Sequence, residues 1–179
     1  MTTKRKKSSN ATALSRRALV RSAVTAVAAA GVTAPASAQN AAGGKPGSNT
    51  RFIQPGGTYQ TPTYTHVVEV TGPGRLIYTS GEQGRDKDGK LAPDIRGQSV
   101  QVLENIKNAL AAVGATFDHV IKFNVYMLDL EKSLPVFSGI KAQYVNRSAP
   151  PASTTVQVSK LTRGALIEVE VIASLPPVA

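Results

Sequence analysis

The sequence contains no cysteine and no tryptophan, and its only histidines are His66 and His119. Without cysteine the chain forms no disulfide, offers no thiolate to a metal and has no cysteine nucleophile. Two histidines also leave little for a transition-metal site, because imidazole and thiolate are common ligands of these metals. We therefore predict neither a metal nor a cofactor, although the count leaves open a site made of carboxylates alone.

Acidic residues are absent from positions 1–38, and basic residues are frequent there. A basic stretch at 4–7 is followed by the pair Arg16-Arg17, an alanine-rich apolar run and the small residues Ala36-Ser37-Ala38. This order is typical of an export signal, and the twin arginine resembles the twin-arginine translocation signal. We expect cleavage before Gln39, the twin-arginine export machinery as a partner, and a periplasmic or otherwise exported protein.

Long hydrophobic runs are also absent. A membrane-spanning helix needs about 20 consecutive apolar residues, and the apolar run near the N-terminus is shorter than that. Gly31 and Pro35 interrupt it further. We therefore expect no stable membrane anchor.

The formal net charge of +10 comes mostly from the predicted signal. Residues 1–38 hold 7 of the 21 basic residues and none of the 11 acidic ones, so the remaining chain carries 14 − 11 = +3. A phosphate-binding surface clusters its basic residues on the folded domain, and no such cluster follows Gln39. We expect no nucleic acid among the partners.

The remaining 179 − 38 = 141 residues suit one compact domain. Residues 39–63 are rich in Gly, Pro, Ser, Thr and Asn, and this composition favours a flexible leader, partly ordered near 51–53. We place the folded domain at 64–179.

Periodicity within this domain predicts an α+β fold. The runs 64–70 and 75–80 are β-rich and flank Thr71-Gly72-Pro73-Gly74, which favours a hairpin. Apolar spacing predicts a helix over 94–113, a strand over 119–128, a shorter helix over 133–146 and strands over 153–159 and 165–173. We expect one mostly antiparallel sheet with both helices on one face. The predicted inner face of the first helix comprises Val100, Leu103, Ile106, Leu110 and Val113.

The last strand has one wholly apolar side, from Ala165 to Ala173 at every second residue, and one mixed side. The strand 119–128 similarly places Ile121, Phe123, Val125 and Met127 on one side. A mixed face with interleaved apolar and polar groups is typical of a subunit interface with polar pockets, so we predict a homo-oligomer. The predicted mixed face comprises Leu166, Glu168, Glu170 and Ile172; Tyr64, His66 and Val68; Lys122, Asn124 and Tyr126; and Ser153, Thr155 and Gln157.

Several short motifs occur in an order that resembles the reactive intermediate deaminase (Rid, or YjgF-like) family. They are Tyr64-Thr65-His66, Tyr78-Thr79-Ser80-Gly81, Gln98 through Asn105-Ile106, the segment 150–156 and the segment 167–173. The resemblance covers the chain from about Arg51 onward. It implies the chorismate-mutase-like fold and a homotrimer with three intersubunit clefts.

The resemblance also implies functional residues. Tyr64 resembles a tyrosine that reaches into the family's cleft, Ser80 and Gly81 resemble the pair that lines it, and Glu168 resembles a carboxylate near the attacking water. A carboxylate on the mixed face of a buried strand can act as a base, although cross-strand pairing alone also explains Glu168. The predicted catalytic residue is Glu168, and the predicted substrate-binding residues are Tyr64, Ser80, Gly81, Phe137 and Ser153.

The sequence also departs from the family pattern. Ser153 stands where deaminating members carry an arginine that holds the substrate carboxylate in a bidentate pair. Glu82 stands where glutamine is usual, and Phe137 lies near a position that often holds asparagine. All three changes predict an altered pocket.

Two functional hypotheses follow. The first is an exported Rid-like trimer that binds a small molecule in its intersubunit cleft and hydrolyses an imine or enamine, but is a poor 2-imino acid deaminase. The alternative is a non-catalytic trimer of the cell envelope that binds a small ligand or another protein.

Overall fold

The computed structural model describes the backbone of Asn40–Ala42 and residues 49–177. The predicted export signal at 1–38 lies outside the described residues, as do positions 39 and 43–48 of the predicted leader. Within the described part, no helix has the length and apolarity to cross a membrane.

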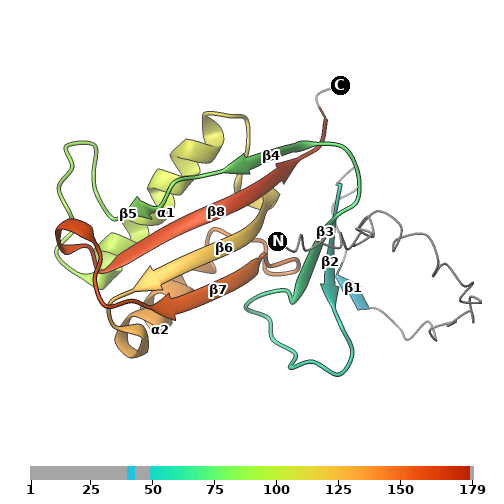
Figure 1. The fold of residues 1–179 in the computed structure, drawn as a ribbon, viewed down its shortest axis with the longest axis horizontal. Coiled ribbons are helices and arrows are strands. Elements are labelled where there is room, and N and C mark those ends of the chain that lie inside the picture. The colour runs from blue at the N-terminus through green and yellow to red at the C-terminus, as the bar shows by residue number, and fades with distance from the viewer. Residues whose placement is uncertain (1–39, 43–48, 178–179) are drawn as a thin grey trace, which may run out of the picture. The chain divides into compact units, whose positions relative to one another are not determined.

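A five-stranded sheet forms the centre of the domain (Figure 1). Its path runs β4 (Arg75–Tyr78), β8 (Ile167–Leu175), β6 (Val120–Met127) and β7 (Ala152–Gln157), and the short β5 (Glu82–Gln83) also pairs with β8. Only β6 and β7 run parallel. The α+β class with a mostly antiparallel sheet is therefore confirmed.

Both helices, α1 (Ile95–Ala111) and α2 (Leu130–Lys141), cover the same face of this sheet (Figure 1). The core lies between them and the sheet. Ile167, Val169 and Val171 of β8 are almost fully buried there, which confirms the predicted apolar side of the last strand. Leu103, Ile106 and Leu110 of α1 are buried against them in one hydrophobic cluster.

Helix α1 begins where Asp94 caps it, since the Asp94 carboxylate accepts a hydrogen bond from the Gly97 N–H at 2.7 Å. Its inner face is rotated from the prediction. Val102 is completely buried, whereas Val100 is 42% exposed and Val113 is 40% exposed. The helix buries residues 99, 102, 103, 106 and 110 on one side. Because Ser99 on this side is polar, the spacing of apolar residues alone does not identify the buried face.

Strand β6 departs from strict alternation at its start. Val120 is buried in place of Ile121, while Phe123, Val125 and Met127 are buried as predicted. A register shift between Val120 and Lys122 in the pairing with β8 accounts for the difference, because a bulge moves the following side chains by one position.

The second helix lies about three residues earlier than predicted. Asp129 caps α2 by accepting a hydrogen bond from the Lys132 N–H at 3.1 Å, so the helix starts at Leu130 and ends at Lys141. Asp129 as a capping residue and Glu131 in the first turn indicate this helix start, whereas the spacing of apolar residues alone does not.

The predicted hairpin of 64–70 with 75–80 is wrong. Strand β3 (Val67–Val70) pairs with β2 (Thr50–Gln54) in a separate sheet that also contains β1 (Asn40–Ala42), and β4 pairs with β8. β3 thus pairs with the strand before it, and β4 pairs with the last strand of the chain. Pro73 between them has no N–H for a ladder, and the Thr71 N–H is bonded to the Asn49 carbonyl at 2.7 Å.

The predicted mixed face changes accordingly. Tyr64, His66 and Val68 do not belong to the five-stranded sheet. On β7, Thr154 pairs with Asn124 and Val156 with Tyr126, so they share the face of those residues, since partners in register point to the same side. Ser153, Thr155 and Gln157 therefore point to the helix-covered side, and their predicted place on the mixed face is wrong.

The rotated face of α1 gives the first prediction. Val102→Ala should lower the free energy of unfolding by about 2 kcal/mol, because it removes two buried methyl groups. The matched exposed change, Val100→Ala, should stay within about 0.5 kcal/mol. Urea unfolding at a fixed protein concentration measures both. Equal losses at the two positions would contradict the observed helix orientation.

Candidate functional site

A groove of about 790 Å³ lies beside β5, between α1 and the loop that follows β5. Its walls are mainly polar, and they include one carboxylate of β8. The lining residues are Gly81, Glu82, Gln83, Arg85, Asp86, Lys87, Gly89, Gln101, Asn105, Asn108, Thr162 and Glu168.

The two carboxylate oxygens of Glu168 have different surroundings in this groove. Oε2 accepts a hydrogen bond from Gln83 Nε2 at 2.6 Å, and the same Gln83 nitrogen lies 2.9 Å from the Thr162 hydroxyl. Oε1 lies against Gly81 and accepts no hydrogen bond from any residue that the structure describes. One oxygen therefore fixes the carboxylate, and the other is open to a ligand or water.

Gly81 allows this close approach, because a larger residue would force the Glu168 side chain to shift. A Cβ at position 81 would collide with Oε1, Cδ and Cγ of Glu168. Thr79 sets the position of this segment, because its N–H donates to the Val171 carbonyl at 3.1 Å and its hydroxyl accepts from the Val171 N–H at 2.9 Å. Ser80 lies between these two residues and is exposed. The structure thus brings Gly81 and Glu168 together, whereas Ser80 is next to Gly81 in the chain but is not among the residues that line the groove.

The other wall of the groove is held by side-chain to backbone bonds. Asn105 of α1 donates through Nδ2 to the carbonyls of Gln83 and Arg85 at 3.0 and 2.9 Å. Arg85 donates to Gln83 Oε1 and to the carbonyls of Gly89 and Arg163. These bonds satisfy the polar groups of β5 and fix the amide of Gln83 that holds Glu168.

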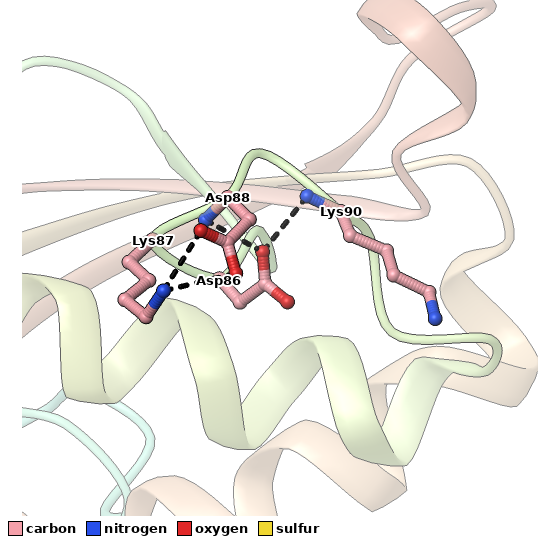
Figure 2. Close-up of polar contacts among 4 residues, drawn as sticks. All are labelled: Asp86, Lys87, Asp88 and Lys90. Carbon is pink, nitrogen blue, oxygen red and sulfur yellow. Dashed lines mark hydrogen bonds and ion pairs between the residues drawn. The ribbon is translucent and has the colours of Figure 1, made fainter.

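The rim of the groove is the tight turn 86–90. Figure 2 shows one Asp86 carboxylate oxygen accepting from the backbone N–H groups of Asp88 and Lys90, at 3.0 and 2.9 Å. The Lys87 ammonium pairs with Asp88 at 2.8 Å. Gly89 has φ +80, which glycine adopts without strain. Both acidic side chains therefore build the turn, and within residues 49–177 no three His, Asp or Glu side chains gather as metal ligands would.

Glu82 lies in the same groove, with its backbone paired to Val169. Burial raises the pKa of the Glu82 carboxyl, and the nearby negative charge of Glu168 raises it further. A proton is therefore held more firmly on Glu82 than on an ordinary glutamate.

Tyr64 lies away from this groove. Its carbonyl accepts a hydrogen bond from Gln54 Nε2 at 3.0 Å, and its ring meets the His66 ring edge-on at a centroid distance of 5.3 Å. The neighbouring Thr65 is buried and bonds to the carbonyls of Pro150 and Pro151. Within one chain Tyr64 therefore stands near the start of β7, not near Glu168.

Ser153 and Phe137 also lie apart from Glu168. Ser153 is in register with Phe123 and faces the helix layer, whereas Glu168 is in register with Tyr126 on the opposite face. Phe137 is 1% exposed and belongs to the core between α2 and the sheet. It has no accessible surface in the single chain, because the apolar ring is packed among core residues.

Sequence reasoning missed Gln83, Arg85 and Asn105 as the residues that hold Glu168 in place. No periodic signal marks Gln83 and Arg85, because β5 has only two residues and its neighbours form loops. Asn105 is a polar residue within an amphipathic helix, and its role depends on a loop that is 20 residues earlier in the chain.

The raised pKa of Glu82 gives a prediction on pH. The folded protein binds this proton more tightly than the unfolded chain, so ionisation of Glu82 costs stability as the pH rises through the raised pKa. Glu82→Gln should therefore be more stable than the wild type at pH 7. The difference should shrink as the pH falls below the ordinary value of 4.5.

Thermal unfolding at pH 7 and pH 4 measures this difference. Glu131→Gln, at an exposed position in the first turn of α2, serves as the control and should give no such gain. A gain for Glu82→Gln that is unchanged at pH 4 would contradict the assignment.

Comparisons with known proteins bear on the family and the fold. The model of the family described as Endoribonuclease L-PSP matches residues 58–175. Protein DfrA of Myxococcus xanthus is 35% identical over 112 residues, which cover 62% of this chain and 83% of that protein. The 2-iminobutanoate/2-iminopropanoate deaminase of Salmonella typhimurium is 33% identical over 102 residues, which cover 56% of this chain and 80% of the enzyme.

A solved structure shows the same fold. YyfB of Yersinia pestis, described as a protein of unknown function of the conserved Rid protein family, matches with a TM-score of 0.62 and 29% identity. The match covers 71% of this chain and 99% of that one. The fold, the matched residues and the relatives agree, and the chain belongs to the endoribonuclease L-PSP family, which includes the Rid and RutC proteins.

Proposed function

We propose that this protein is an exported homotrimer that binds a small molecule in an intersubunit cleft and hydrolyses an imine or enamine, with Glu168 as the base. The observation that carries the proposal is the Glu168 carboxylate, which Gln83 holds through Oε2 while Oε1 is open beside Gly81. A relative named as an imine deaminase supports the reaction class.

The chemistry requires one oriented water. Glu168 Oε1 accepts a proton from this water while the water oxygen attacks the carbon of the protonated imine, and the C=N electron pair moves to nitrogen. The resulting carbinolamine takes a proton at nitrogen, its C–N bond breaks and its hydroxyl proton leaves, which gives a carbonyl compound and ammonia. Glu82, with its raised pKa, lies in the same groove and is suited to carry a proton during these transfers.

Substrates with a carboxylate next to the imine should be poor ones. Ser153 cannot form the two parallel bonds of an arginine fork. Loss of that pair costs about 1.5 to 3 kcal/mol of binding, which is roughly ten- to hundredfold in affinity. We therefore expect weak turnover of ordinary 2-imino acids.

The exposed side of the sheet supports the homotrimer. Leu76 and Tyr78 of β4 are 53% and 68% exposed, and Val156 of β7 is 41% exposed. Tyr78 is in register with Ile172 and Val156 with Tyr126, so apolar groups from four strands share this open face. An apolar face of this kind is typical of a subunit interface.

Cleavage of RNA, which the name of the family suggests, receives less support from the groove. Glu82, Asp86 and Glu168 give it several carboxylates, which repel a phosphate backbone. Arg85 donates to Gln83 and to two backbone carbonyls, and Lys87 pairs with Asp88. The two cations are thus engaged within the protein itself.

A non-catalytic trimer that binds a small ligand or a protein of the cell envelope remains the second candidate. The exposed apolar face and the absence of a bidentate arginine at Ser153 favour it. A ligand that raises the melting temperature without being consumed would support this candidate.

Glu168 gives the main test. Glu168→Gln keeps the shape and the bond to Gln83 but removes the base, so ammonia release should fall by at least about a hundredfold. Glu170→Gln is the matched control, because Glu170 lies on the same face of β8 but bonds to Asn124 at 2.9 Å outside the groove. Ammonia release from freshly generated imines, one neutral and one with a carboxylate, measures both variants. No wild-type turnover of either imine would favour the binding protein.

Gly81 gives a second test of the same site. Gly81→Ala places a methyl group against Glu168 and should displace the carboxylate, which lowers turnover by roughly a hundredfold if the displacement is about 1 Å. Gly72→Ala is the control, because no atom lies within 4 Å of the added methyl group. Full activity of Gly81→Ala in the same ammonia assay would contradict the assigned role of Glu168.

A further inference from the structure

Arg85, two residues after the end of β5, donates to three acceptors at once. Its Nε–H donates to Gln83 Oε1 at 3.1 Å, and its two terminal nitrogens donate to the carbonyls of Gly89 and Arg163 at 3.0 and 3.3 Å. None of these acceptors is a carboxylate, and Arg85 forms no ion pair among residues 49–177. The half-buried guanidinium therefore acts as a set of hydrogen-bond donors within the wall of the groove.

The orientation of the Gln83 amide is decided by its hydrogen-bond partners, because the oxygen and nitrogen ends of a side-chain amide have nearly the same size. Oε1 accepts from Arg85, and Nε2 donates to Glu168 Oε2 at 2.6 Å. Arginine has donors and no acceptor, so a reversed amide would set two donors against each other. Thr162 makes no such choice, since its hydroxyl can accept from Nε2 or donate to Oε1. Arg85 thus fixes the amide whether or not Glu168 carries a proton.

This orientation decides where a proton can reside on Glu168. A donor at Oε2 favours the carboxylate form of that oxygen, and it leaves Oε1, beside Gly81, as the oxygen that takes a proton from water. A reversed amide would place Gln83 Oε1 against Glu168 Oε2. Two acceptors share a hydrogen bond only if one of them is protonated, so the proton would be held at Oε2 between the two side chains. In that state Glu168 cannot act as a base.

We propose that Arg85 is a positioning residue for the base. By fixing the orientation of the Gln83 amide, it keeps Oε2 of Glu168 free of a proton, so that Oε1 takes the proton from water. This inference rests on the proposed function, since it concerns the base of that reaction. One O–H bond of water breaks as the O–H bond at Oε1 forms. Arg85 exchanges no proton itself, because a guanidinium stays charged in proteins.

Other titratable groups also surround Glu168. They are Glu82 on β5, Tyr126 on β6, Glu170 on β8, and Asp86 and Lys87 at the rim of the groove. Among the described residues, none of them bonds to the Gln83 amide, whose partners are Arg85, Thr162 and Glu168. These groups are the same in every variant of Arg85. A difference in pH dependence between two such variants therefore reports Arg85 and the amide.

The first test is the pH profile of ammonia release from one neutral imine, measured between about pH 4 and pH 9. Arg85→Gln brings an amide that can donate or accept, so it permits both orientations of Gln83. Its acid limb should move up by about one pH unit, so about tenfold more activity is lost on the acid side than at the top of the profile. Arg85→Lys has only donors, and its acid limb should stay close to that of the wild type.

Arg75→Gln is the matched control, because Arg75 lies on β4, does not line the groove and donates to the Val113 carbonyl at 3.3 Å. Its profile should follow that of the wild type. A loss in Arg85→Gln that is equal at every pH would show a merely structural role and overturn the proposal. The same shift in Arg85→Lys would also count against it.

The second test needs no substrate, so it stays decisive if the wild type hydrolyses no imine and the proposed function fails. NMR of the isotope-labelled protein measures the nuclear Overhauser contact between the Gln83 amide protons and the Thr162 side chain, whose hydroxyl lies 2.9 Å from Nε2. The contact should persist down to about pH 4 in the wild type and in Arg85→Lys. In Arg85→Gln it should fade as the pH falls, because the amide reverses.

Two outcomes of this measurement would contradict the proposal. Loss of the contact in the wild type at low pH would mean that Arg85 does not fix the amide, and this result decides even where Arg85→Gln does not fold. A contact that persists in Arg85→Gln beside a shifted acid limb would mean that Arg85 acts through its charge alone.

Discussion

The pairing of β8 with three other strands is the constraint on which the rest of this structure depends. β4, β5 and β6 all bond to β8, so its alternation of side chains decides which face of the sheet is covered by helices. The helices cover the face that carries Ile167, Val169 and Val171, because burial of these side chains against α1 removes apolar surface from water. A one-residue shift of β8 would expose these residues and bury Glu168 and Glu170.

The same alternation of side chains along β8 places Glu168 in the candidate groove. Since Val169 points inward, Glu168 points outward toward the short strand β5. Glycine at position 81 lets the chain approach its carboxylate, and Asn105 anchors β5 to α1. Successive residues of β8 therefore belong alternately to the core and to the groove. The packed core holds β8 in place, and this fixes the position of Glu168.

The edge of the sheet formed by β7 differs from the edge at β5 in its side-chain contacts. β7 is the terminal strand, and its parallel register places Ser153 beside Phe123 under the end of α2. Phe137 fills the core in this layer, and Lys141 lies over Phe123 with no carboxylate partner among the described residues. The polar side chains of β7 bond to single neighbours, since Thr154 accepts from Lys122 and Gln157 accepts from the Leu130 N–H, whereas the groove at β5 is held by a connected set of bonds.

Local patterns in the sequence predict most of the helices and strands and the two different sides of the last strand. The 3.6-residue spacing of α1 and the strict alternation from Ala165 to Ala173 are local patterns, and they predicted the α+β sheet with its helix-covered face. Short motifs such as Tyr78-Thr79-Ser80-Gly81 also predict the family, and this resemblance assigns Gly81 and Glu168 to one site, in agreement with their contact.

The pairing of the strands depends on contacts that form only in the folded chain. The β3 and β4 segments have the pattern of a hairpin, yet β3 pairs with the strand before it and β4 with the last strand, and no local pattern encodes this difference. Alternation along the strand predicts Ser153 on the mixed face, but the parallel register with β6 turns it toward the helices. The role of Gln83 likewise comes from its contact with Glu168, which lies 85 residues later in the chain and is brought close only by folding.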